Sequence, residues 1–201
     1  MSALRFRTLL IAAALAVAAC ATASAQDKQF SQPPDKLPKV QRGQDLDFLF
    51  GALKAAPDAE SAKAVEGRIW AVWMVSKSDT ANLLMTRVRT AVEAKKLDLA
   101  VELLDKIVLL RPDYVEAWNR RATIHFMRKD FTRSIEDIRQ VLAREPRHFG
   151  ALAGLGMIMQ ELGDDKRALE VYRRAVEINP HMQRITELIK SLTEKVEGRD
   201  I

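Results

Sequence analysis

Hydrophobic positions recur at helical spacing over most of this chain, from about residue 45 onward. In the first such stretch Leu46, Leu49, Phe50 and Leu53 are spaced by 3, 1 and 3 residues, which puts them in one stripe of an amphipathic helix. No run of alternating β-branched residues stands out, and only 8 glycines occur in 201 residues. The pattern therefore predicts an all-α protein.

The start of this helical region is predicted to be a degenerate helix pair over residues 45–80. Its second helix carries Trp70 and Trp73 on the same face as Ile69 and Met74. This spacing is typical of a buried helical face. The tryptophans are therefore expected in the core rather than stacked on a ligand.

A regular repeat governs the region that follows. Pro112, Pro146 and Pro180 recur every 34 residues. Three further columns keep the same interval and register: Ala100, Ser134 and Ala168; Leu84, Trp118 and Leu152; and Leu104, Ile138 and Tyr172. A fixed period of this length predicts stacked units that bury their apolar faces against one another.

These units resemble tetratricopeptide repeats, which are helix-turn-helix modules of that length. In the last unit the matching residues are Leu152, Leu155, Gly156, Ala168, Tyr172, Ala175 and Pro180. The resemblance implies a right-handed superhelix (α-solenoid) of antiparallel helix pairs, with repeats at 81–114, 115–148 and 149–182. Ile185, Leu188, Ile189 and Leu192 form one apolar face of a helix whose opposite face is polar. This pattern predicts a capping helix over 183–199.

Several of these repeat positions have a physical reason that can be stated in advance. Gly156 and Ala168 are expected to be small because two helices cross closely there, while Tyr172 fills space between layers. The prolines are expected to end the second helix of each unit, since proline cannot continue a helix.

The paired arginines of "AWNRRATIHFMRKDF", residues 117–131, raise the alternative of a nucleic-acid patch. A common variant of the repeat pairs an arginine at the Arg121 position with an aspartate on the second helix, and Asp137 occupies the matching place. The resemblance therefore implies a structural pair between Arg121 and Asp137. Arg87, in the same column, is matched by Leu103 and lacks such a partner.

In tetratricopeptide proteins the first helices of successive units line a concave groove. Carried onto this chain, the positions that commonly face it are Asn82, Met85, Thr86, Arg89, Val92 and Glu93; Glu116, Asn119, Arg120, Thr123, Phe126 and Met127; and Gly150, Ala153, Gly154, Met157, Gln160 and Glu161. The residues expected to contact a partner are Met85, Arg89, Asn119, Arg120, Thr123, Phe126, Met127 and Met157. The alternative is a solvated concave face without a ligand.

The chemistry of this set favours a peptide ligand. Arg89 and Arg120 offer fork-shaped donors for carboxylates, and Asn119 can bond to a peptide backbone. Phenylalanine and methionine side chains form an adaptable apolar strip. Gly150, Ala153 and Gly154 are expected to leave one end of the groove open, so that a backbone could approach closely. The lysine and asparagine set of the repeat proteins that bind chaperone tails is not reproduced.

The stretch "EPRHFGALAGLG", residues 145–156, resembles a group of exported bacterial repeat proteins. The fold alone does not require a histidine, a phenylalanine and a glycine (His148, Phe149 and Gly150) at this junction between repeats. Two interpretations stay open: these residues mark a ligand-binding end of the groove, or His148 caps a turn.

The N-terminal segment, 1–25, has the features of a secretory signal: Arg5 and Arg7, a short apolar run, and "ASA" before a cleavage point. Cys20 ends "VAAC", which resembles a lipobox, so lipidation at Cys20 is the alternative to cleavage after Ala25. Residues 26–44 contain three prolines and are interpreted as a flexible lead-in. The expected location is the periplasm, with membrane attachment only if Cys20 is lipidated.

Charge and candidate chemistry narrow the functional classes further. The formal net charge of +5 falls to +3 without the two signal arginines, and an exported protein rarely meets nucleic acid, so no nucleic-acid partner is expected. The three histidines form no close-spaced pair and have no cysteine partners. We expect no catalytic, metal or cofactor site.

Together these features predict a non-enzymatic adaptor or scaffold of the bacterial cell envelope, whose groove binds a segment of another envelope protein. The alternative is a structural component that self-assembles through its terminal helices without a groove ligand. A homo-oligomer is compatible with both.

Overall fold

Helices make up almost all of the described part of the chain, residues 42–198, in the computed structural model. In order they are α2 (Arg42–Lys54), α3 (Ala59–Met74), α4 (Asp79–Glu93), α5 (Leu97–Leu110), α6 (Val115–Met127), α7 (Phe131–Arg144), α8 (Phe149–Glu161), α9 (Asp165–Ile178) and α10 (Gln183–Val196). These residues contain no strand, which confirms the all-α prediction. The predicted signal and Cys20 lie outside the described residues.

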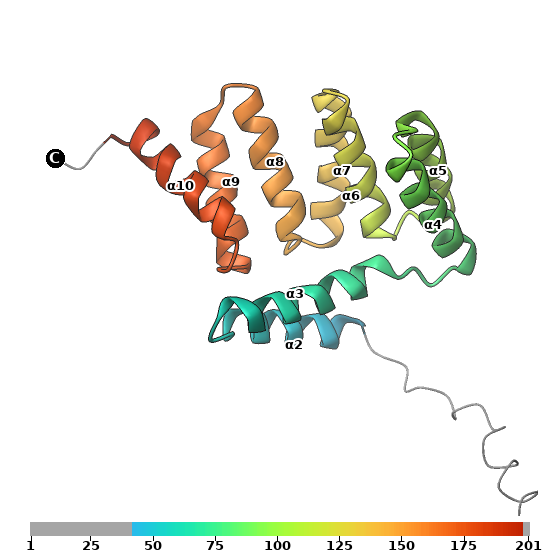
Figure 1. Cartoon of the computed structure of the whole chain (residues 1–201), viewed down its shortest axis with the longest axis horizontal. Coiled ribbons are helices and arrows are strands. Elements are labelled where there is room, and N and C mark those ends of the chain that lie inside the picture. The colour runs from blue at the N-terminus through green and yellow to red at the C-terminus, as the bar shows by residue number, and fades with distance from the viewer. Residues whose placement is uncertain (1–41, 199–201) are drawn as a thin grey trace, which may run out of the picture. The chain divides into compact units, whose positions relative to one another are not determined.

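Helices α4 to α9 form three antiparallel pairs that stand side by side as a solenoid, and α10 packs on the last pair (Figure 1). Within a pair the first helix packs along the second, and each second helix also contacts the first helix of the next pair. Apolar side chains repeat at this contact because each pair must bury one face against its neighbour. The predicted tetratricopeptide-type arrangement is therefore present.

The ends of the repeat helices follow from local sequence. Helices α5, α7 and α9 end at Leu110, Arg144 and Ile178, each two positions before one of the regularly spaced prolines. Proline restricts the residue before it to extended conformations, which stops the helix. At the start of α7, the side chain of Asp130 accepts a hydrogen bond from the backbone N–H of Arg133.

The close crossing predicted in the last repeat is confirmed. A Cβ atom added to Gly156 would lie 2.3 Å from Cε1 of Tyr172, so the two helices can approach only without a side chain there. The Tyr172 ring is fully buried, and its hydroxyl donates to Oε1 of Gln160 at 2.7 Å. Burial raises the pKa of Tyr172 to about 12.

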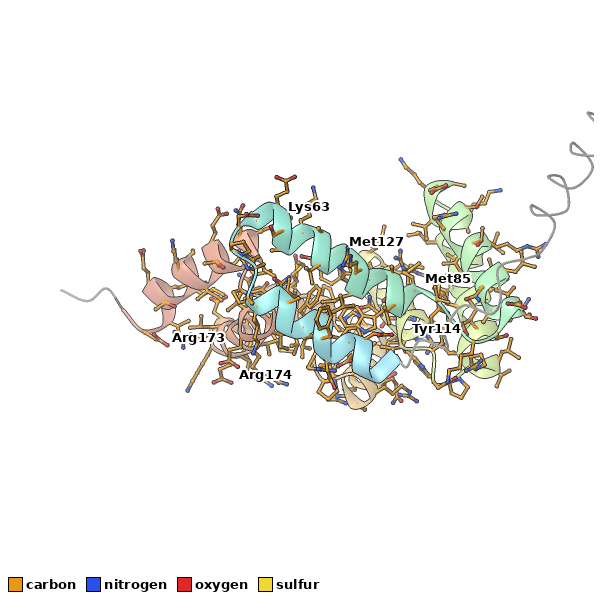
Figure 2. The ribbon with its side chains drawn as sticks, turned by 90° about the horizontal axis from the view of Figure 1, so that it is seen from below. Lys63, Met85, Tyr114, Met127, Arg173 and Arg174 are labelled. Carbon is orange, nitrogen blue, oxygen red and sulfur yellow. The ribbon has the colours of Figure 1, made fainter. Side chains whose placement is uncertain are left out.

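The pair formed by α2 and α3 lies across the lower ends of the repeat helices (Figures 1 and 2). Its apolar face forms one cluster with Phe149 at the start of α8, with Ile178 at the end of α9 and with Met182 beside α10. Both tryptophans belong to this cluster, with Trp73 buried and Trp70 partly buried. Trp73 is a core residue as expected, whereas Trp70 packs on the same cluster and also lines a pocket between α4 and α6.

Polar contacts also join α2 and α3 to the repeats. Nδ2 of Asn179 donates to Oε2 of Glu66 at 3.0 Å, and Nη1 of Arg147 lies 2.6 Å from Oδ1 of Asp47. Where α3 ends, the hydroxyl of Tyr114 donates to the carbonyl oxygen of Met74 at 2.5 Å. These contacts join residues far apart in the sequence, and they fix α3 along one edge of the solenoid.

Candidate partner-binding groove

A pocket of about 450 Å³ lies between α4 and α6, and α3 closes one side of it. We call it the α4–α6 pocket; its lining is Trp70, Met74, Asn82, Met85, Thr86, Val88, Arg89, Val92, Glu93, Glu116, Asn119, Arg120, Thr123, Ile124 and Met127. The volume is in the range of small-ligand and peptide side-chain sites. Six of the eight residues expected to contact a partner line it: Met85, Arg89, Asn119, Arg120, Thr123 and Met127.

The floor of this pocket is apolar because α4 and α6 turn their buried faces toward it. Met85, Val88 and Ile124 are all nearly inaccessible to solvent. Met127, by contrast, is 54% exposed at the rim. Unbranched methionines can adapt to differently shaped apolar groups, so the pocket can accept a large side chain without a single fixed partner shape.

The two arginines of the pocket differ in how far they are engaged. Arg120 donates from Nε to Oε1 of Glu116 at 3.0 Å, and its Nη2 lies 3.2 Å from Sδ of Met74. The side chain of Arg89 is exposed and makes no ion pair or hydrogen bond with any other residue in the described range. Arg89 is therefore the cation that remains available to an incoming carboxylate.

Glu116 is a buried carboxylate in the wall of the pocket, with a relative exposure of 1%. Besides Arg120 it accepts a hydrogen bond from Nδ2 of Asn119 at 3.0 Å, and its Oε2 lies 3.4 Å from Nε2 of His148. Nδ1 of His148 accepts from the backbone N–H of Ala151 at 3.0 Å. Nε2 of His148 is buried and, despite lying near Glu116, makes no hydrogen bond with the described residues.

His148 caps helix α8, as one of the two interpretations of "EPRHFG" expected, while Gly150 of the same stretch lines the α6–α8 side of the groove. The imidazole is fully buried and stacks on the indole of Trp73, with ring centroids 4.0 Å apart. A helix cap of this kind satisfies one of the free N–H groups at the first turn.

A second pocket, of about 200 Å³, lies on the other flank of α6. We call it the α6–α8 pocket; its lining is Asn119, Ala122, Thr123, Phe126, Ser134, Ile138, Gly150, Ala151, Gly154, Met157 and Ile158. It contains the remaining two expected contact residues, Phe126 and Met157. Asn119 and Thr123 line both pockets, so the two pockets adjoin along α6, and we call them together the groove.

The expectation that Gly150 leaves one end of the groove open is wrong. A Cβ atom on Gly150 would lie 2.7 Å from Cη2 of Trp70, so the space is filled by an indole of the same chain. Gly154 does border open space, since a Cβ atom there would meet only Cδ1 of Ile138, at 3.9 Å. Gly150 therefore lines the groove, but the space for a side chain on it is filled by Trp70, whereas Gly154 borders open space.

Sequence reasoning missed the contribution of α3 to the groove. Trp70 and Met74 line the α4–α6 pocket, but the repeat register assigns groove positions only to the first helices of repeats. The only sequence signal was the unexplained "HFG" at the junction before α8. Phe149 packs against Trp70 there, and Trp70 occupies the space beside Gly150.

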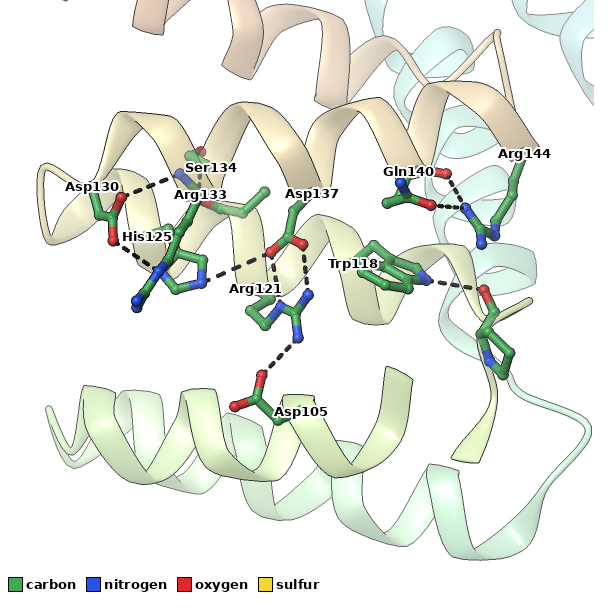
Figure 3. Close-up of polar contacts among 12 residues, drawn as sticks. Asp105, Trp118, Arg121, His125, Asp130, Arg133, Ser134, Asp137, Gln140 and Arg144 are labelled. Atoms are coloured by element: carbon green, nitrogen blue, oxygen red, sulfur yellow. Dashed lines mark hydrogen bonds and ion pairs between the residues drawn. The ribbon is translucent and has the colours of Figure 1, made fainter. Parts of the chain in front are cut away.

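The predicted Arg121 to Asp137 pair is confirmed (Figure 3), and neither residue lines the two pockets of the groove. The guanidinium donates from Nε to Oδ2 at 2.9 Å and from Nη2 to Oδ1 at 2.7 Å, while Nη1 reaches Asp105 of the preceding repeat at 2.6 Å. Hydrogen bonding to Asp137 raises the pKa of Arg121, against the opposing effect of burial. This arginine is thus structural and joins three helices.

Beside this pair, His125 is buried, with Nε2 3.9 Å from Oδ2 of Asp137 (Figure 3). Burial lowers the pKa of His125 below 6.5, and the nearby carboxylates of Asp137 and Asp130 oppose that shift. Within residues 42–198 no group of three or more histidine, cysteine or acidic side chains is arranged to hold a metal ion. None of the helices in that range is long and apolar enough to cross a membrane.

The fold and groove define a helical-repeat protein of the interaction type, and the comparisons agree. Residues 85–139 and 128–182 match the tetratricopeptide repeat family. A TPR repeat-containing protein of Rhizobium etli is 40% identical over 155 residues, which cover 77% of this chain and 76% of the relative. The chain belongs to the tetratricopeptide repeat family.

Solved structures with the same fold include a repeat domain bound to a peptide. The first TPR of Spaghetti (RPAP3), bound to the HSP90 peptide SRMEEVD, has a TM-score of 0.57 at 20% identity and covers 60% of this chain and 96% of its own. A crystal structure of MamA has a TM-score of 0.56 at 20% identity, covering 73% and 84%. At these identities the likeness shows the fold alone. Tetratricopeptide repeats are in general non-catalytic interaction modules.

Proposed function

We propose that this protein is a non-enzymatic adaptor of the bacterial cell envelope that binds a segment of another envelope protein in the groove over α6. The observation that carries the proposal is the exposed, unpaired Arg89 at the rim of an apolar pocket in the described part of the chain. An unpaired cation beside an apolar floor suits a peptide that offers both an acidic and a large apolar side chain.

Side chains of the groove are also held in place by contacts with a buried residue in its wall. Arg120, Asn119 and His148 all converge on the buried carboxylate of Glu116. Side chains fixed in this way lose little freedom when a ligand arrives, so less binding energy is spent on ordering them. The complex of the Spaghetti repeat with its peptide shows that this fold can hold a peptide segment.

The envelope location rests on the N-terminal segment, 1–25, with its basic start, apolar run and small residues before the cleavage point at Ala25. A protein exported in this way meets other exported proteins. We therefore expect the partner to be a periplasmic protein or the periplasmic part of a membrane protein.

Charge reversal at Arg89 tests the proposal. Cells of a host bacterium that express tagged wild type, Arg89→Glu or Arg87→Glu are crosslinked, and captured envelope proteins are identified by mass spectrometry. Arg87 is a matched control because it is an exposed arginine of the same helix that lines neither pocket. The proposal expects one partner to be lost with Arg89→Glu and kept with Arg87→Glu. Equal capture by all three proteins contradicts it.

A second candidate, assembly through the terminal faces, is favoured by one observation on the first repeat. Leu83 of α4 and Leu99 and Leu109 of α5 are exposed, Leu109 by 85%. Apolar side chains gathered at the end of a solenoid can stack on another copy. Sedimentation velocity separates the candidates, since this one predicts oligomers that Leu109→Glu dissociates and Arg89→Glu does not.

A further inference from the structure

The two pockets of the groove lie on opposite flanks of one helix, and this determines how far apart a ligand must place its side chains. The α4–α6 pocket and the α6–α8 pocket share only Asn119 and Thr123, which stand one turn apart on α6. An α-helix with its side chains is about 10–12 Å across. Two side chains that enter the two pockets are therefore separated by roughly 10 Å.

That separation selects a backbone conformation for the ligand. In a polyproline II segment the side chains of residues three apart point the same way, and they are about 9 Å apart. In a β-strand, residues two apart share a face but are only about 7 Å apart, whereas residues three apart point to opposite faces. Of these two extended conformations, the polyproline II spacing is the better fit to pockets on the two flanks of α6.

Each pocket also has its own chemistry. The larger one, about 450 Å³, has Trp70, Met74, Met85 and Met127 in its walls and suits an aromatic ring, since thioethers and indoles contact aromatic groups favourably. The smaller one, about 200 Å³, has Phe126, Ile138 and Met157 around the open space at Gly154 and suits an aliphatic side chain.

Two polar side chains, Asn119 between the pockets and Arg89 beside the larger one, add further requirements on the ligand. On the crest of α6, Oδ1 of Asn119 accepts no hydrogen bond from the described residues, so it can accept one from a ligand backbone N–H. Arg89 lies on α4, on the side of the larger pocket that faces away from α8. A carboxylate that pairs with Arg89 must therefore flank the aromatic residue on its outer side.

From these observations we infer that the groove binds an extended, polyproline II-like segment with an acidic residue next to an aromatic residue, followed three positions later by an aliphatic residue. The sequence can run in either direction across the helices. The inference rests on the proposed function, because it describes the ligand of the same groove.

Selection from random peptides of a dozen residues displayed on phage tests the inference with a defined probe. The full-length protein is the bait, and the selected peptides are then made synthetically and their binding is measured by fluorescence anisotropy. Wild type is expected to enrich an aromatic and an aliphatic residue three positions apart, with an acidic residue beside the aromatic one.

Filling the smaller pocket gives the decisive variant. Gly154→Leu adds a side chain where a Cβ atom meets only an ordinary contact, so the helix should still form, whereas Gly67→Leu adds the same side chain to an open position on α3. We expect Gly154→Leu to weaken the selected peptides about tenfold or more, and to remove the benefit of their aliphatic residue. Gly67→Leu should bind them as wild type does.

The outcomes separate this inference from the proposed function. Peptides that lose binding with Arg89→Glu but show another spacing, or that bind Gly154→Leu unchanged, overturn the inference and leave the groove function standing. Selection that yields no peptide dependent on Arg89 overturns both.

Discussion

The indole of Trp73 lies flat on the imidazole of His148, with ring centroids 4.0 Å apart and ring planes within 10°. One residue comes from the helix pair that precedes the repeats, and the other caps the first helix of the last repeat. Trp73 is 6% exposed and His148 is fully buried. This contact fastens α3 to the solenoid and so fixes one wall of the groove.

Trp73→Ala is expected to destabilise the protein by about 3–5 kcal/mol, because it leaves a cavity beside His148 and Phe149. Urea denaturation followed by circular dichroism measures this loss. The matched control is Phe48→Ala on the neighbouring helix α2, where the ring is 73% exposed. That change should alter the free energy of unfolding by no more than about 0.5 kcal/mol. Similar losses in both variants would show that α3 is not anchored by Trp73.

Gly156→Ala is expected to cost about 1–3 kcal/mol, although alanine is the better helix former. The added methyl would lie 2.3 Å from the fully buried ring of Tyr172, so the two helices must move apart. Gly67→Ala is the control, since a Cβ atom added to that helical glycine would have nothing within 4 Å. It should stabilise the protein by roughly 0.5–1 kcal/mol. Thermal unfolding of both variants beside wild type decides the sign of each change.

Stability should depend on pH through His125. Burial lowers the pKa of the folded-state imidazole below 6.5, so the unfolded state binds the proton more readily. The free energy of unfolding therefore falls as the pH drops below about 6.5, with a slope from this group of at most about 1.4 kcal/mol per pH unit. Below the folded-state pKa the loss is complete.

The variant His125→Gln should remove this part of the slope. Urea unfolding at several pH values between neutral and mildly acidic isolates it as the difference between wild type and variant, because the carboxylates contribute to both. Parallel curves for the two proteins would mean that His125 does not carry the acid sensitivity.

The N-terminus of the protein recovered from cells tests the proposed export. Cleavage after Ala25 predicts a chain that starts at Gln26, whereas lipidation predicts an acylated Cys20 as the first residue. Mass spectrometry of the intact protein distinguishes the two products. A chain that still begins at Met1 or Ser2 would contradict export by this signal.

The repeats could be predicted from sequence because their determinants recur at a fixed interval. The prolines just past α5, α7 and α9 and the close crossing at Gly156 each express a local requirement of one helix pair. The Arg121 to Asp137 pair was predictable for the same reason, since both residues belong to one repeat and only 16 positions separate them.

The position of α3 could not be predicted in this way. Its partners lie on late repeats: Asn179 is 113 positions from Glu66, and Arg147 is 100 positions from Asp47. An amphipathic stripe shows that a helix buries one face, but not which distant surface receives it. The role of Gly150 was misjudged for that reason, because the space it provides is filled by Trp70.

The central claim is that partners bind in the groove, and site-specific photocrosslinking in cells tests it most directly. A photoreactive amino acid is placed at Met127, which is 54% exposed on the rim of the α4–α6 pocket, or at Leu109, which is 85% exposed on α5 and lines neither pocket. Irradiation is predicted to join an envelope protein to position 127 and not to position 109, and Arg89→Glu should abolish the product. Crosslinks that form only at position 109, and that join two copies of this chain, would contradict the claim.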